Sequence, residues 1–213
     1  MAPMKIADSR IKPTFELEAA ELQLGLGPVA GVDEAGRGPW AGPVVAAAVI
    51  LDPDRIPANI DDSKTLDEEA RAYLYNRIIK VADVGVGIAD ISRIDRDNIL
   101  NATLWAMGEA VGSLRSQPKL VLIDGNKAPR LAMATRTIVK GDAKCLSIAA
   151  ASIIAKVTRD RIMVALAKEY PGYGFERHKG YGTPEHQVAM AKLGACALHR
   201  RSFKPVQLAL GLL

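Results

Sequence analysis

The chain has 213 residues and a net charge of +4, and 49% of its residues are hydrophobic while 24% are charged. This is the composition of a globular domain, which excludes a disordered chain, a collagen and a coiled coil. The chain has only two cysteines and no CxxC spacing, which excludes a disulfide framework and a cysteine zinc site. Its longest apolar run, Val44 to Leu51, is too short for a membrane-spanning helix. Because no signal peptide is recognisable either, we expect a cytoplasmic protein.

The first predicted elements form a β-hairpin with an unusual loop. Residues 1–28 are interpreted as an N-terminal extension, in which FELEAAELQL predicts one or two helical turns. Val29 to Asp33 and Val44 to Leu51 have the apolar character of buried strands. The connection between them, residues 36–43, is rich in glycine and proline, which favour turns.

Helices and strands alternate in the rest of the chain. Thr65 and Glu68 are spaced as a capping box that opens a helix reaching about Val81, and Ser92 with Asp95 predicts the start of a second helix reaching about residue 114. Further strands are predicted over 84–91, 119–124 and 135–139, and a long helix over 146–169. This order predicts one α/β domain over residues 29–213, built on a mixed β-sheet flanked by helices.

Positive charge is concentrated in the C-terminal third. Residues 140–213 contain 12 lysines and arginines against 5 aspartates and glutamates, a balance of +7, whereas residues 1–139 contain 16 against 19. Clustered cations of this kind suit a polyanion such as nucleic acid, and a solvated basic surface is the simpler alternative. The basic surface expected from this third of the chain includes Lys156, Arg159, Arg161 and Arg200.

Acidic residues follow three of the predicted strands. Asp33 and Glu34 close the first strand, Asp124 closes the strand over 119–124, and Asp142 follows the strand over 135–139. The glycines around Gly36 match neither a P-loop nor a dinucleotide-binding turn. Carboxylates gathered at a sheet edge repel one another unless cations are present, and oxygen ligands of this kind suit Mg²⁺ or Mn²⁺.

Two such ions can support the hydrolysis of a phosphodiester bond. Because adjacent residues of a regular strand face opposite ways, we expect the first strand to end or bulge at Asp33 and Glu34. A turn or a helix cap is the alternative role for any one of the four acids taken alone.

Several motifs in sequence order resemble a known family. They are GVDEAGRGP at 31–39, AGPVVAAAV at 41–49, DSK at 62–64, IDGN at 123–126, KGD at 140–142, SIAAASIIAKVTRD at 147–160 and HKGYGT at 178–183. Their order and spacing resemble type 2 ribonuclease H, specifically bacterial ribonuclease HII, from about Ala30 to Pro205.

The resemblance implies a ribonuclease H-like sheet with a helical C-terminal part. It implies a monomeric endonuclease that cuts the RNA strand of RNA–DNA hybrids and incises 5′ of single ribonucleotides in duplex DNA, leaving a 3′-hydroxyl and a 5′-phosphate. It places the metal-binding acids at Asp33, Glu34, Asp124 and Asp142. It also implies a ribose-reading loop and further substrate contacts at Gly36, Arg37, Gly38, Lys64, Lys179 and Tyr181. Glycines let a backbone approach the sugar and bond the 2′-hydroxyl.

Other features are interpreted more simply. His178, His186 and His199 fit no metal-binding spacing and are expected at the surface or near phosphates. Trp40 departs from the smaller residue usual in the family, and we expect it to pack under the loop. Residues 207–212, QLALGL, resemble peptides that dock on the bacterial sliding clamp, although an apolar chain end is the simpler reading.

Two other classes of function remain open at this stage. A non-catalytic hybrid-binding module would need only the basic surface and the loop, and a cleavage assay with and without EDTA separates it from a nuclease. A metal-dependent phosphatase of small substrates would have little use for the basic third, and its activity would be insensitive to salt.

Overall fold

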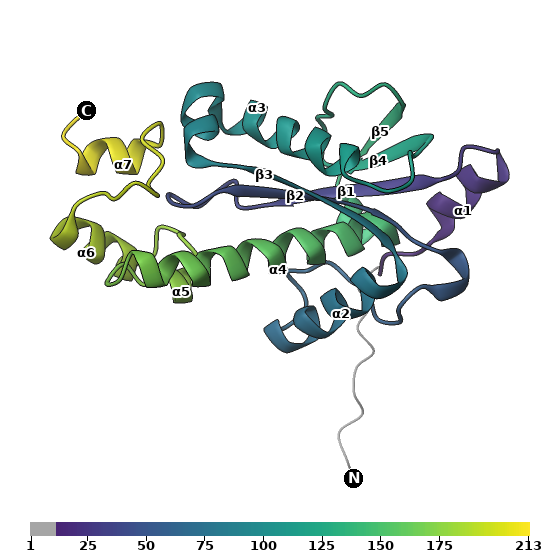
Figure 1. Ribbon diagram of the computed structural model, residues 1–213, viewed down its shortest axis with the longest axis horizontal. Helices are drawn as coiled ribbons and strands as arrows, with labels where there is room; N and C mark the ends of the chain where they lie inside the picture. The colour runs from purple at the N-terminus through teal and green to yellow at the C-terminus, as the bar shows by residue number, and fades with distance from the viewer. Residues whose placement is uncertain (1–11) are drawn as a thin grey trace, which may run out of the picture.

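The computed structural model describes residues 12–213 and consists of a central sheet between helices (Figure 1). The strands are β1 Val29–Ala35, β2 Val44–Ile50, β3 Asp83–Ala89, β4 Leu120–Asp124 and β5 Ala134–Ile138. The helices are α1 Glu16–Gln23, α2 Glu68–Val81, α3 Ile91–Gly112, α4 Leu146–Glu169, α5 Phe175–His178, α6 Pro184–Leu193 and α7 Lys204–Ala209, with short 3-10 turns at Pro53–Arg55 and Gly141–Ala143. Within residues 12–213, no helix is both long and apolar enough to cross a membrane.

The sheet has the order β3-β2-β1-β4-β5 and is mixed, as the sequence predicts. β1, β2 and β3 form an antiparallel meander, so the predicted hairpin is confirmed. β4 lies parallel to β1, and β5 lies parallel to β4. The carboxyl ends of β1, β4 and β5 therefore meet at one edge of the sheet.

Helices cover both faces of this sheet (Figure 1). The side chains of β2 alternate, so that Ala46 and Ala48 pack on the α3 side while Ala47 and Val49 pack on the α4 side. α4 lies very close to β1, because a methyl group added at Gly31 would stand 2.2 Å from the carbonyl carbon of Ser147. The alanine-rich start of α4 permits this contact and fixes the helix beside the sheet edge.

The N-terminal segment is joined to the same core. The helix predicted in FELEAAELQL is α1, and its Glu18 carboxylate accepts a hydrogen bond of 2.7 Å from the amide of Ser147 at the start of α4. Glu21 of α1 pairs with Arg136 of β5 at 2.6 Å. α1 is thereby held against α4 and the β5 edge strand.

Three local predictions were wrong. β1 neither ends nor bulges at Asp33 and Glu34 but stays paired with β2 as far as Ala35. α2 is capped by Asp67, which accepts from the amide of Ala70, while the Thr65 hydroxyl donates to a backbone carbonyl instead. Asp90 rather than Ser92 caps α3, since the Asp90 carboxylate accepts a hydrogen bond from the amide of Arg93 in the first turn.

α3 also contains a break that the sequence did not indicate. Asn98 has a positive φ of 65°, and its side chain accepts hydrogen bonds from the amides of Leu100 and Asn101, as a helix cap does. α3 is therefore two helical segments that meet at a kink.

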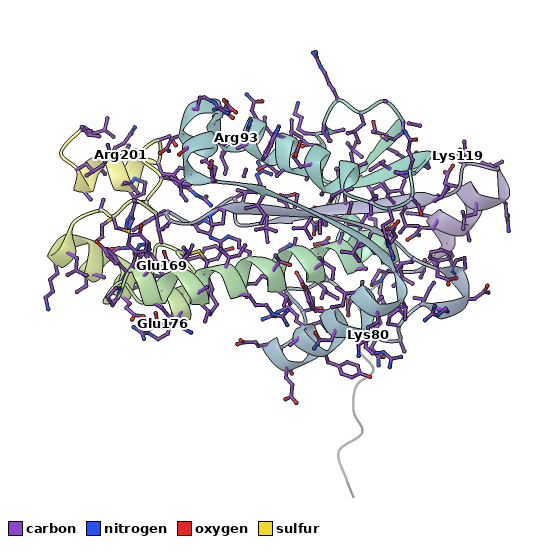
Figure 2. All side chains as sticks on the ribbon, viewed as in Figure 1. Lys80, Arg93, Lys119, Glu169, Glu176 and Arg201 are labelled. Carbon is purple, nitrogen blue, oxygen red and sulfur yellow. The ribbon has the colours of Figure 1, made fainter. Side chains whose placement is uncertain are left out.

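The C-terminal part is helical, as predicted, and covers the loop between β1 and β2. α5, α6 and α7 gather at the end of the molecule where that loop lies (Figure 1). Figure 2 labels Arg93 on α3 and Arg201 on the C-terminal segment at this same end. The two segments are joined by Asp95, whose carboxylate accepts from the amides of Arg201 and Ser202.

Candidate active site

Three aspartates converge at the carboxyl edge of the parallel strands. Val32 of β1 is paired with Ile123 of β4, so the next residues along, Asp33 and Asp124, end up side by side. Asp142 joins them from the 3-10 turn between β5 and α4. One carboxylate oxygen from each aspartate lies within 4.8 Å of the others.

The position of Asp142 follows from the turn that carries it. The amide of Gly141 donates a 2.7 Å hydrogen bond to the Asp124 carboxylate, which ties this turn to the end of β4. A methyl group added at Gly141 would lie 2.6 Å from Cδ1 of Ile148, so a side chain there would force Ile148 to move. The glycine before Asp142 thus lets the turn close onto the acids.

Burial and mutual repulsion disfavour the charged forms of Asp33 and Asp124. Asp33 is 5% exposed, and burial raises its pKa well above the ordinary value, with Glu34 and Asp124 raising it further. Burial also raises the pKa of Asp124, and the hydrogen bond from Gly141 opposes this increase. A buried group of oxygen ligands that repel one another fits a hard divalent cation, which would relieve the repulsion.

Glu34 lies outside this group of three. Because β1 is regular here, Glu34 points to the α3 face, where it lines a hollow with Thr103, Met107 and Asp124. Burial raises the pKa of Glu34 and Arg37 lowers it, with their nearest charged atoms 3.5 Å apart. Asp124 lines the same hollow, and its charge also raises the pKa of Glu34.

Lys64 supplies a positive charge to the cluster. Its ammonium lies 3.2 Å from the carboxylate of Asp142. The turn that carries Lys64 is fixed by Ser63, whose amide donates to the hydroxyl of Ser152 on α4. Burial alone would lower the pKa of Lys64, but the hydrogen bond and charge of Asp142 raise it.

The predicted ribose-reading loop and Tyr181 lie beside each other. A methyl group added at Gly38 would stand 3.7 Å from the ring of Tyr181, which is 45% exposed. The Trp40 ring was predicted to pack under the loop. It packs against Gly182, next to Tyr181, and so lies against the HKGYGT segment. Lys179, from the same segment, lines a separate hollow between α2 and α4.

The three histidines are buried, so the prediction that they lie at the surface was wrong. The amide of Cys196 donates to Nδ1 of His199, which leaves the proton of the neutral ring on Nε2. That nitrogen lies 3.0 Å from Nε2 of His186, whose Nδ1 is 2.9 Å from the carbonyl of Tyr181. His178 stacks on His186, with ring centroids 4.5 Å apart. His199 and His186 therefore support, as neutral rings, the segment that carries Tyr181.

Two functional candidates escaped the sequence analysis. Arg159 and Arg200 were assigned to the basic surface, yet they are 1% and 0% exposed and bond to backbone carbonyls. Helical spacing carried a signal for Arg159, because it lies on one face of α4 with the buried Ala155 and Met163. For Arg200 no sequence pattern separates it from the exposed Arg201.

The strand order and the acids at the ends of neighbouring strands define a ribonuclease H-like endoribonuclease. The fold agrees with solved structures: the ribonuclease H2 of Pyrococcus horikoshii is 28% identical, with a TM-score of 0.74 over 86% of this chain and 97% of that one. The ribonuclease HII of Archaeoglobus fulgidus, solved in a complex with PCNA, is 26% identical, with a TM-score of 0.71 over 85% and 96%.

The sequence comparison is more specific. The ribonuclease HII family profile matches residues 30–206. The ribonuclease HII of Azorhizobium caulinodans is 58% identical over 194 residues, which is 91% of this chain and 75% of that protein. The chain belongs to the ribonuclease HII family, whose members cleave the RNA of RNA–DNA hybrids.

Proposed function

We propose that this chain incises duplex DNA 5′ of single embedded ribonucleotides, besides cutting the RNA strand of hybrids, and leaves a 3′-hydroxyl and a 5′-phosphate. The observation that carries this proposal is the nearness of the loop to both Tyr181 and the acids: a methyl group added at Gly38 would stand 3.7 Å from the Tyr181 ring, and Arg37 lies 3.5 Å from Glu34, the neighbour of Asp33. A glycine loop admits a sugar that has a 2′-hydroxyl, and an aromatic face beside it suits a neighbouring deoxyribose.

The acids are proposed as the ligands of the cofactor, Mg²⁺ or Mn²⁺. Asp33, Asp124 and Asp142 would hold one ion, because their oxygens already lie within one coordination sphere of each other. Glu34, which lines one hollow with Asp124, would join Asp124 in holding a second ion. Divalent ions supply Lewis-acid stabilisation of the charge that develops in phosphodiester hydrolysis.

Basic and polar groups of the chain would position the substrate. Arg37 is half exposed next to Glu34 and can pair with a phosphate bidentately. Lys64 is exposed apart from its contact with Asp142, and we propose that it and Lys179 contact phosphates on either side of the cut. Tyr181 would pack on the sugar next to the ribonucleotide.

A cleavage assay tests this function. Labelled duplexes of one sequence would contain no ribonucleotide, a single ribonucleotide or an all-RNA strand, and each would be incubated with Mg²⁺, Mn²⁺ or EDTA. We expect cleavage 5′ of the single ribonucleotide in either metal and none in EDTA, with a product end that a DNA polymerase extends. Asp33→Asn should remove turnover, whereas Asp54→Asn, an exposed acid remote from the cluster, should retain it. Cleavage of the all-RNA strand alone would contradict the proposal.

A sliding clamp is proposed as a partner through residues 207–212. The Archaeoglobus relative is known in a complex with PCNA, and here Leu208 and Leu212 are 55% and 63% exposed and free to contact another protein. Deletion of residues 207–213 should abolish binding to the bacterial clamp in a pull-down assay while leaving cleavage unchanged. Undiminished binding of the truncated chain would refute this partner.

A further inference from the structure

Arg159 and Arg200 form a buried arginine pair beneath the loop that joins β1 to β2. Neither forms an ion pair with a carboxylate within residues 12–213, and burial lowers the pKa of Arg159 to about 10 and that of Arg200 to about 9. Both values leave the guanidinium groups charged at neutral pH. Burying two cations without acidic partners is unfavourable unless every donor is satisfied.

The arginine pair is satisfied by backbone carbonyls. Arg200 donates to the carbonyls of Gly36, Arg37, Gly42 and Pro43, at 2.6 to 3.2 Å. Arg159 donates to those of Ala41, Pro43 and Lys179, at 2.9 to 3.1 Å. The pair therefore joins the predicted ribose-reading loop to the HKGYGT segment that carries Tyr181.

Most of the remaining loop groups are also engaged by the C-terminal part. The amides of Trp40 and Ala41 donate to the carbonyl of Gly180, and the amide of Gly42 donates to that of Leu198. In contrast, within residues 12–213 the amides of Arg37 and Gly38 have no hydrogen-bond partner. Because the carbonyls of Gly36 and Arg37 are held on the inner side, the loop offers amide donors on its open side.

Steric contacts show that the loop and the arginine pair are fitted to each other. Gly36 has a φ of +98°, and a methyl group added there would stand 2.0 Å from Nε of Arg159. The two requirements, a left-handed backbone and no side chain, select glycine at this position. The loop conformation thus depends on guanidinium groups that come from α4 and from the segment before α7.

We propose that Arg159 and Arg200 are positioning residues for ribonucleotide selectivity, which fix the loop so that the amides of Arg37 and Gly38 face the substrate. This inference rests on the proposed function, because it assumes that the loop reads the ribonucleotide. The arginine pair does not touch the nucleic acid; it acts through the carbonyls that it holds. A planar fork with five donors can satisfy such a set of carbonyls, and a lysine cannot.

The test is the selectivity of Arg200→Lys, with Arg201→Lys as the matched control. Selectivity is the Ki of an all-DNA duplex divided by the KM of the same duplex with one ribonucleotide. For Arg200→Lys we expect this ratio to fall about tenfold or more, through the KM, with the Ki unchanged. Arg201→Lys, whose side chain is exposed, should keep the wild-type ratio. A folded Arg200→Lys protein with wild-type selectivity would overturn the inference.

Hydrogen exchange on the unsubstituted loop gives a second test that does not depend on whether the lysine variant folds. In the free protein, the amides of Trp40 and Gly42 should exchange slowly, and those of Arg37 and Gly38 rapidly. In the inactive Asp33→Asn protein, a ribonucleotide duplex should protect Arg37 and Gly38, and an all-DNA duplex should not. Protection of these two amides in the free protein would overturn the inference. A wild-type enzyme with no preference for the ribonucleotide duplex would instead overturn the proposed function.

Discussion

The ammonium of Lys64 lies 3.2 Å from the carboxylate of Asp142, and this contact brings a positive charge to a group of acids that repel one another. In the absence of a divalent ion, Lys64 offsets part of that repulsion. When an ion binds, the same charge opposes it. The pair therefore links the electrostatics of the free protein to its affinity for metal.

Replacement of Lys64 by glutamine should strengthen metal binding. The exposed ammonium is screened by solvent, so the gain in Mn²⁺ affinity should be modest, up to about fivefold. Lys80→Gln at the end of α2, an exposed lysine that Figure 2 labels, should leave the affinity unchanged. Calorimetric titration with Mn²⁺ measures both. Weaker binding by Lys64→Gln would show that the lysine supports the metal site rather than competing with the ion.

The two glycines of the loop should respond differently to alanine. Gly36→Ala places a methyl group against Arg159 at a φ of +98°, so it should lower the free energy of unfolding by about 1–3 kcal/mol. Gly38→Ala meets nothing closer than 3.7 Å, so its stability should stay within about 0.5 kcal/mol of the wild type. Urea unfolding compares them. Equal losses of stability would contradict the described packing of the loop.

The buried histidines should make stability fall as the solution becomes acidic. Burial, together with the neighbouring His186, lowers the pKa of His199 to about 4, from an ordinary value of 6.5. Below pH 6.5 the unfolded chain binds a proton at His199 that the folded protein does not bind. The contribution of the neutral His199 to stability is therefore complete above pH 6.5 and is lost as the pH falls from 6.5 to about 4. The loss should approach about 1.4 kcal/mol per pH unit, or about 3 kcal/mol in all.

The comparison with His199→Gln isolates this effect, because the titration of the acids is common to both proteins. The difference in the free energy of unfolding between wild type and variant, measured in urea at pH 7.5, 6.5 and 5.5, should shrink as the pH falls. Parallel pH dependences would contradict a neutral, buried His199.

The sequence predicted which acids lie at the sheet edge, but not which face of the sheet each side chain occupies. Asp33 and Asp124 could be found because each ends an apolar strand, and parallel strands bring such ends to one edge. The predicted strand end at Asp33 failed because pairing with β2 keeps β1 regular through Glu34. Which face Glu34 occupies depends on that register, which a local pattern does not specify.

Three residues that support the loop, His186, His199 and Arg200, could not be found for a different reason. His186 and His199 are 13 residues apart and meet only because the chain folds back, and nothing in their spacing indicates the contact. Arg200 and Arg201 are adjacent and chemically identical, and only tertiary packing buries one of them. Polar residues buried by long-range contacts therefore escape analysis by composition and spacing.

Without a bound metal ion, Asp33→Asn should make the protein more stable, because it removes one of the repelling charges. The pKa of Asp33 is raised in the folded protein, so its ionisation opposes folding. This penalty is absent below the ordinary pKa of 3.8 and becomes complete as the pH rises through the raised folded value. In EDTA at pH 7.5, the thermal midpoint of Asp33→Asn should therefore exceed that of the wild type. With excess Mn²⁺ the wild type should gain more stability than Asp33→Asn does. A lower midpoint for Asp33→Asn in EDTA would contradict this.

The most direct test of the shared cation site is calorimetric titration of Mn²⁺ into the wild type, Asp124→Asn and the remote control Asp54→Asn. If Asp33, Asp124 and Asp142 hold one ion together, Asp124→Asn should bind Mn²⁺ about tenfold or more weakly, while Asp54→Asn should match the wild type. Equal Mn²⁺ affinity for all three proteins would contradict the account.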